Sequence, residues 1–483
     1  MSAPMIWILF PGVIAVVLFA LQKRRTVVYL TSTVLAFILA ALAWAAPIGD
    51  TISIGNISIE LSSTLTILGR RFILDANDRY TLVLIYLGVA FWFAGTPAAN
   101  ASRLFIPLGL AIAALLTSAL AVEPFLYAAL IIEMMVLVSI PLLSPPGSRP
   151  GRGIGRYLTF QTLGFPCILF TGWLMARIET NPAETHLVVF AGLLLALGFG
   201  FLLGIFPFHT WIPMLAHETH PYAIAFIFYE LPVAISLLIL GFMDRYVWLR
   251  TVPQVYTVIG FTGALMVMIG GFWAAFQSHL GRLMGYAVMV EIGISLLAVQ
   301  VGLGPDGSGP ALGLFFALIL PRGLTLGVWA LALVVLSRGS NRSFSEAENL
   351  PTSGLSYDNA EGLGRTFPVA TFCLLLSHFS FAGIPLLAGF PVRLALLEGM
   401  AQVSILVALV SLIGYAGLMV GGIRAMAVLI TGKEEIPWRS LETRLERTLL
   451  ITGGVLIILI GILPQWFTPA LARMAQSFTQ LGR

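Results

Sequence analysis

The chain has 483 residues, of which 58% are hydrophobic and 10% are charged, and its mean hydropathy is +0.96. Soluble globular domains carry about 25% charged residues, so this composition excludes a soluble protein and predicts an all-α, polytopic membrane protein. The net charge of +4 is explained by basic residues at cytoplasmic helix ends and does not call for a nucleic-acid partner.

The sequence lacks the usual signatures of cofactor chemistry. Cys167 and Cys373 lie in separate apolar runs, so they form neither a CxxC pair nor a disulfide framework. No GxxxxGK[ST], GxGxxG or HExxH motif is present. His217 and His220 flank Glu218 with a spacing that fits one helical turn and could suggest a metal site of H-E-x-H type, but no third or fourth ligand is evident. We therefore expect no cofactor and no metal in this chain.

Apolar runs separated by polar breaks predict fourteen membrane-spanning helices, each near the ~20 residues that a bilayer requires. The runs lie near 5–21, 27–46, 79–96, 104–121, 124–143, 157–176, 187–206, 222–242, 256–275, 283–301, 311–336, 367–396, 401–430 and 447–464. Two helices are interrupted, at 204–213 and 383–391. Broken helices at membrane depth often mark the translocation site of a transporter; proline kinks used only for packing are the alternative.

The ends and loops of the helices give an orientation. Placing the N-terminus outside puts most of the 26 basic residues inside, which predicts that both termini lie outside. Residues 51–60 alternate apolar and polar side chains, so they form either a short outer hairpin or a plain surface loop. Residues 464–483 are expected to include a short interfacial helix.

Several motifs resemble one family. The segment 206–221, PFHTWIPMLAHETHP after its first Phe, resembles the PFHxWLPxAHxxAP segment of the antiporter-like membrane subunits of respiratory complex I. Residues 72–75 match an FxxD, 282–286 resemble KRLLAYSS, and 383–385 with 389–390 resemble GIPxxxGF. The chain thus resembles a divergent member of the superfamily that holds the M, N and L chains of NADH:quinone oxidoreductase and the large subunits of multisubunit Na⁺/H⁺ antiporters.

This resemblance implies a domain organisation. In that family helices 4–8 and 9–13 form two five-helix units that are related by inverted symmetry. Here it implies helices 1–3 with the outer hairpin in 1–103, a first five-helix unit in 104–242, a second in 256–430, and a last helix and tail in 447–483.

The resemblance also identifies the positions of the family's ionisable residues. At some of these positions this chain has a different residue. Glu133 takes the place of the family glutamate on helix 5, and Glu291 on helix 10 is its symmetry counterpart. The family lysines of helices 7 and 8 fall on Leu202 and Ala234. Glu230 is an additional acidic residue one turn before Ala234.

Arginines replace two further titrating residues. Arg322 stands for the family histidine of helix 11 and Arg393 for the lysine of helix 12. Arginine stays protonated, so it cannot take part in the proton exchange that a buried lysine supports. The lysine relay of the family is therefore incomplete in this chain.

A charge at the bilayer centre costs roughly 2.5 to 3.5 kcal/mol on insertion scales, so ionisable residues inside predicted helices are candidates for function. The candidate proton or ion path consists of Glu133, His209, Glu230, Glu291, Arg322, His378 and Arg393. The alternatives are fixed ion pairs or interhelical hydrogen bonds for Glu133 and Arg322, and a purely structural role for His209.

Three functions follow from this reading. The first is a proton-translocating membrane subunit of a complex I-like NADH:quinone oxidoreductase or a related redox-driven pump, using buried carboxylates and water. The second is a structural membrane module that lost the lysine relay, and the third is the membrane subunit of an ion-driven bicarbonate-uptake system. The expected partners are other membrane subunits, a soluble arm and lipid, and the expected location is the inner (cytoplasmic) membrane.

Overall fold

The computed structural model describes residues 2–46, 48–49, 51–54, 57–67, 69–146, 151–180, 185–303, 312–340, 355–431, 439–478 and 480–481. Within these residues ten helices are long and apolar enough to cross a membrane. Four shorter apolar helices, Met5–Ala20, Phe105–Ala121, Tyr127–Leu143 and Pro368–Ala382, complete the set of predicted spans. The all-α, polytopic fold class and the number of apolar helices predicted from the sequence are confirmed.

The chain packs as two compact units. Unit 1 contains Met1–Ala94, Ser102–Thr210 and Glu230–Arg245, and unit 2 contains Gly95–Ala101, Trp211–Tyr229 and Tyr246–Arg483. The predicted domain boundaries at 103, 242, 256 and 430 stay a prediction.

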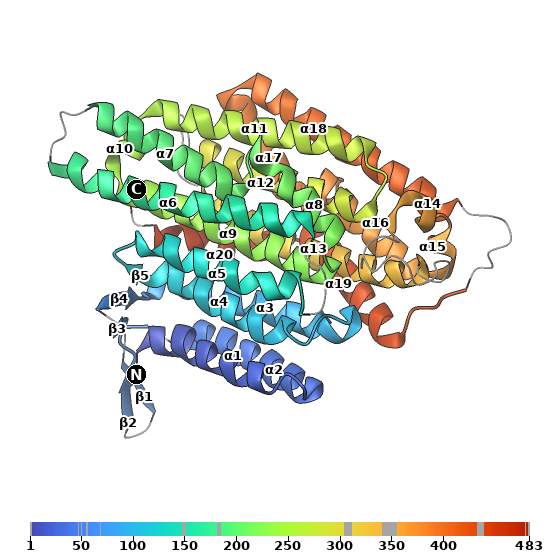
Figure 1. Ribbon diagram of the computed structural model, residues 1–483, viewed down its shortest axis with the longest axis horizontal. Helices are drawn as coiled ribbons and strands as arrows, with labels where there is room; N and C mark the ends of the chain where they lie inside the picture. Colours follow the sequence, from blue (N-terminus) through green and yellow to red (C-terminus); the bar gives the residue numbers. More distant parts are fainter. Residues whose placement is uncertain are drawn as a thin grey trace. The chain divides into compact units, whose positions relative to one another are not determined.

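Unit 1 is built from consecutive helices. Its helical elements are the π-helix Met5–Leu9, α1 (Phe10–Ala20), α2 (Arg25–Ala45), α3 (Arg79–Ala99, which ends in unit 2), α4 (Phe105–Ala121), α5 (Tyr127–Leu143), α6 (Arg152–Thr180), α7 (Thr185–Leu203) and two 3₁₀ turns, Ala76–Asp78 and Phe208–Thr210. Helix α4 packs against α1 and α5, α5 against α6, and α6 against α7 (Figure 1). The carboxylate of α5 therefore has α6 as a direct neighbour.

Short strands complete unit 1. Of the two alternatives for residues 51–60, the hairpin is the one found: β1 (Thr51–Ile54) pairs antiparallel with β2 (Ile57–Glu60). Its position on the outer surface stays a prediction. A second sheet, β3 (Thr64–Ile67), β4 (Arg70–Ile73) and β5 (Val122–Glu123), was not predicted. Its third strand has only two residues and follows an apolar helix directly, so no alternating sequence pattern predicts it.

Unit 2 is centred on α12. Its helical elements are α8 (Trp211–Glu218), α9 (Pro221–Arg245, which continues into unit 1), α10 (Val247–Thr251), α11 (Pro253–Phe276), α12 (Leu280–Leu303), α13 (Leu312–Ser340), α14 (Tyr357–Ala360), α15 (Leu363–Thr366), α16 (Pro368–Ala382), α17 (Phe390–Val403), α18 (Ile405–Ile430), α19 (Arg444–Ile462), α20 (Thr468–Ala472) and the 3₁₀ turns Pro464–Trp466 and Arg473–Ser477. Helix α12 contacts α8, α11, α13, α16, α17 and α18. The short helices after Pro464 agree with the predicted helical tail, whose residues 479, 482 and 483 lie outside the described residues.

Both predicted helix breaks are present, and they close in the same way. Helix α7 ends before Gly204 and α16 ends before Gly383, and each glycine has a positive φ, of 63° and 81°. Ile205 N–H donates to the Gly200 carbonyl (2.9 Å) and Ile384 N–H to the Phe379 carbonyl (3.1 Å). This bond across a left-handed residue is the Schellman closure that glycine permits at a helix end.

Side chains from neighbouring helices also donate to carbonyl groups at the two helix ends. Gln161 Nε2 on α6 donates to the Leu202 carbonyl at 2.9 Å. Arg393 Nη1 on α17 donates to the Ser380 carbonyl at 2.9 Å. Protein groups thus meet the requirement that backbone freed at membrane depth must be hydrogen-bonded.

A buried carboxylate caps the start of α16. Glu442 Oε1 accepts hydrogen bonds from the N–H groups of Val369 (2.8 Å) and Ala370 (3.0 Å), and Oε2 accepts from Ser440 (2.7 Å). We expect Glu442→Ala to lower the free energy of unfolding by about 1–3 kcal/mol, because two buried donors lose their acceptor. Denaturation of the detergent-solubilised chain measures this. Glu398→Ala, at an exposed position on α17, is the control, and an equal loss in both variants would contradict the capping role.

Candidate functional site

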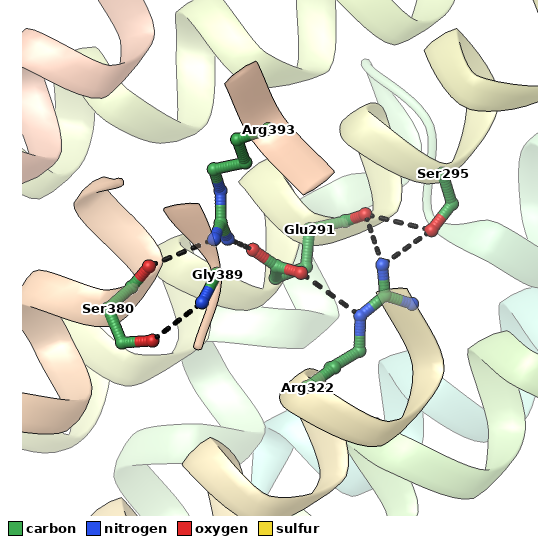
Figure 2. Close-up of polar contacts among 6 residues, drawn as sticks. All are labelled: Glu291, Ser295, Arg322, Ser380, Gly389 and Arg393. Carbon is green, nitrogen blue, oxygen red and sulfur yellow. Dashed lines mark hydrogen bonds and ion pairs between the residues drawn. The ribbon is translucent and has the colours of Figure 1, made fainter. Parts of the chain in front are cut away.

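Glu291 lies at the centre of a buried charge cluster in unit 2. It is 2% exposed and sits in the middle of α12. Figure 2 shows its two carboxylate oxygens turned toward two arginines from different helices. Both arginines are 3% exposed. We call Glu291, Arg322 and Arg393 the charge cluster.

Arg322 holds the α12 side of this cluster. It lies on α13, directly after Pro321. Its Nε donates to Glu291 Oε2 at 3.1 Å, and its Nη2 donates both to the Glu291 carbonyl (2.8 Å) and to Ser295 Oγ (2.5 Å). Ser295 is one helical turn after Glu291, so α12 presents three acceptors to a single guanidinium.

Arg393 reaches the cluster because of the second helix break. Helix α17 begins at Phe390, so Arg393 lies in its first turn. The guanidinium donates through Nη2 to Glu291 Oε1 and through Nη1 to the Ser380 carbonyl. Gly389 N–H donates to Ser380 Oγ at 3.2 Å and ties the other side of the break to α16. One arginine therefore closes a helix end and pairs with Glu291.

The charge cluster consists of two guanidinium groups and one carboxyl group. Neither arginine can accept or release a proton, because guanidinium remains protonated in proteins. The alternative that Arg322 forms a fixed ion pair is the arrangement found, with Glu291 shared between two cations. The geometry of unit 2 favours a fixed charge over a proton relay at this point.

Glu133 in unit 1 has a different environment. Its side chain on α5 is 9% exposed, and Oε1 accepts a hydrogen bond from Thr162 Oγ1 on α6 at 2.8 Å. Oε2 is buried without a hydrogen-bond partner, and no cation pairs with Glu133 among the described residues. Of the two structural alternatives for Glu133, the interhelical hydrogen bond is present, whereas a fixed ion pair is not found in the described part of the chain.

Apolar side chains occupy the two positions of the family lysines. Leu202 is 4% exposed and packs against Gly164, where an added Cβ would lie 2.8 Å from Leu202 Cδ2. Ala234 on α9 is also buried. Glu230, one turn before it, is 2% exposed, and its Oε1 has no hydrogen-bond partner in the described residues.

The two candidate histidines lie at or near the helix breaks. His209 is in the 3₁₀ turn after the α7 break, stacked on Phe206 with ring centroids 5.5 Å apart. His378 is buried on α16 with Nε2 2.6 Å from the Leu418 carbonyl, an oxygen to which only a protonated Nε2 can donate, and its ring contacts Trp329 edge-on. Nδ1 of each histidine is buried without a partner among the described residues.

The structure brings together only part of the predicted path. Glu291, Arg322 and Arg393 meet directly, whereas no hydrogen bond or ion pair within the described residues joins Glu133, His209 and Glu230 to one another, or His378 to the charge cluster. Sequence reasoning missed four polar residues that hold the site: Gln161, Thr162, Ser295 and Ser380. Ser295 alone carries a local signal, since it lies four residues after Glu291 on the same helix face.

His217 packs against a second histidine. Its ring contacts that of His279 edge-on at 4.5 Å, and His279 Nδ1 accepts from Gly281 N–H at the start of α12 (3.1 Å). Across the part of the chain that the structure describes, no group of three His, Cys, Asp or Glu residues is placed to hold a metal ion.

The chain matches known proteins over most of its length. It is 26% identical to the NADH-quinone oxidoreductase subunit N of Coxiella burnetii, with 96% of both chains covered, and 27% identical to that of Methylobacterium nodulans over 62% of this chain and 59% of the relative. Its fold is similar to a chain of respiratory complex I from Thermus thermophilus (TM-score 0.71, 19% identity, 96% and 98% covered). It is also similar to a chain of the Mrp complex from a Dietzia species (TM-score 0.76, 16% identity, 100% and 99% covered).

The matching family model is described as the transmembrane domain of NADH:quinone oxidoreductase and Mrp antiporter subunits, and it covers residues 162–418. This stretch is more than half of the chain and contains α7–α17, including both helix breaks and the charge cluster. The chain therefore belongs to the NADH:quinone oxidoreductase/Mrp antiporter membrane-subunit family.

Proposed function

We propose that this chain is a proton-translocating, antiporter-like membrane subunit of a complex I-like NADH:quinone oxidoreductase or a related redox-driven pump. The observation that carries the proposal is the burial of two carboxyl groups inside apolar helices, at Glu133 and Glu230, with no cation paired to them in the described residues. Intramembrane carboxyl groups are costly and characteristic of proton pathways. The sequence relatives named as subunits N of NADH-quinone oxidoreductases support the redox-driven assembly.

The two units take different parts in this proposal. Glu133 and Glu230 lack a paired cation in the described residues, so they are the groups that take up and release protons, together with His209 and water in unit 1. His378 is the candidate proton carrier of unit 2. The charge cluster supplies a fixed field, because its arginines do not titrate. The buried carboxyl groups would thus carry the protons that lysines carry in the family, since this chain has Leu202 and Ala234 at the two lysine positions.

Electron transfer belongs to other subunits under this proposal, and the chain itself holds no redox cofactor. Its partners are further membrane subunits and a soluble arm that oxidises the electron donor. It lies in the inner (cytoplasmic) membrane with both termini outside, as the distribution of basic residues indicates. Residues 104–242 and 256–430 form its two inverted five-helix units.

Gentle extraction of the native assembly through a tag on the C-terminus tests the proposal. We expect other membrane subunits and a soluble arm with flavin and iron–sulfur proteins to co-purify. We also expect deletion of the chain to lower donor-driven proton uptake by inside-out vesicles, with recovery when the chain is supplied again.

Two results would replace this proposal. A single large soluble partner would point to ion-driven bicarbonate uptake. A redox assembly that pumps equally well after the candidate carboxyl groups are neutralised would leave the chain a structural module, which the apolar residues at 202 and 234 favour.

A further inference from the structure

A small cavity opens beside the charge cluster. Its lining includes Glu291, Arg322 and Arg393 together with Thr325, Ser380 and Gly389. It offers room for about one water molecule. Five helical elements or breaks enclose it, and the lining arginines are almost fully buried.

The charges around this cavity do not balance. Two guanidinium groups share the single carboxyl group of Glu291, and Glu291 is the one acidic residue that lines the cavity among the described residues. With Glu291 ionised, the net charge is one positive unit inside an apolar helix bundle. An uncompensated buried charge is among the most costly features of a folded chain.

Donors remain unused at the same place. Thr325 on α13 is fully buried, and its hydroxyl oxygen has no hydrogen-bond partner in the described residues. Arg393 Nε is likewise buried and without a partner. The Thr325 hydroxyl and the Arg393 Nε–H group both lack an acceptor in the described residues. An anion in the cavity would accept hydrogen bonds from both.

We propose that this cavity binds one monatomic anion of the size of chloride, held by Arg393 and Thr325. Among common anions a halide is the closest in size to the single water molecule that the cavity accommodates, whereas sulfate, phosphate and gluconate are much larger. The bound anion neutralises the excess positive charge and supplies the missing acceptor. This site does not depend on the proposed function, because it requires only the folded chain.

Binding of radiolabelled chloride to the purified full chain in detergent tests the proposal. We expect saturable binding of about one chloride per chain, with displacement by bromide and none by gluconate or sulfate. The apparent unfolding temperature should rise by about 2 °C when chloride replaces gluconate at tenfold its dissociation constant and equal ionic strength.

Two matched variants locate the site. Thr325→Val removes the hydroxyl group from the cavity and should weaken chloride binding about tenfold, the effect of one lost hydrogen bond to a charged group. Thr371→Val removes a buried hydroxyl group that also lacks a partner but lies outside the cavity lining, and it should leave chloride binding unchanged. Absence of chloride binding by the native chain, or equal loss in both variants, would overturn the proposal.

Discussion

Replacing Glu133 with glutamine should reduce proton translocation by the assembled complex by about a hundredfold or more, the scale of loss when a positioned proton-transfer group is removed. Glutamine has nearly the same size and still offers an oxygen to Thr162 Oγ1, which donates to Glu133 at 2.8 Å in the native chain. It cannot carry a proton. Proton uptake by inside-out vesicles, normalised to the amount of assembled complex, measures the loss.

The control for Glu133→Gln is a carboxyl group outside the helix core. Glu123 in β5 is half-exposed and pairs with Arg245 at 3.5 Å, a surface interaction that contributes little. Glu123→Gln should leave both assembly and proton uptake unchanged. Full proton uptake in Glu133→Gln would remove Glu133 from the pathway, and loss of the assembled complex would show that its role is structural.

Sequence patterns predicted the parts of this fold that depend on hydropathy and special backbone residues. Apolar runs of bilayer length define the helices, and Gly204 and Gly383 mark the two breaks because each takes a left-handed conformation that ends a helix. The alternation at 51–60 indicated a hairpin but left a plain surface loop as an equal alternative. The strand at 122–123 was not predictable, since two residues carry no period.

The sequence predicted the individual residues of the candidate site but not which of them contact one another. Glu291, Arg322 and Arg393 are separated by 31 and 102 residues in their two ion pairs, and only helix packing brings them together. Position inside a predicted helix or at a helix break, together with the family resemblance, identified the seven candidates. These signals could not tell the doubly paired Glu291 from Glu133, which has one hydroxyl partner. Partners such as Thr162 and Ser380 are ordinary helix residues until the neighbouring helix is placed.

The charge cluster should dominate the stability of unit 2. Replacing Glu291 with leucine leaves two desolvated guanidinium groups without their carboxylate, and we expect the free energy of unfolding to fall by about 3–5 kcal/mol. In this variant Arg322 would keep two acceptors, the backbone carbonyl of residue 291 and the Ser295 hydroxyl. Arg393 would keep the Ser380 carbonyl. These neutral acceptors satisfy hydrogen bonds but do not cancel charge.

A second substitution separates this electrostatic cost from a simple packing defect. Adding Arg322→Leu to Glu291→Leu removes one of the two unpaired cations, so the double variant should be more stable than Glu291→Leu alone, although it changes more buried atoms. Arg322→Leu by itself leaves one arginine paired with Glu291 and should cost less than Glu291→Leu. Denaturation of the detergent-solubilised chain gives all three values. If the double variant were as unstable as the sum of the two single changes, the cluster would be held by shape and not by charge, because independent packing defects add.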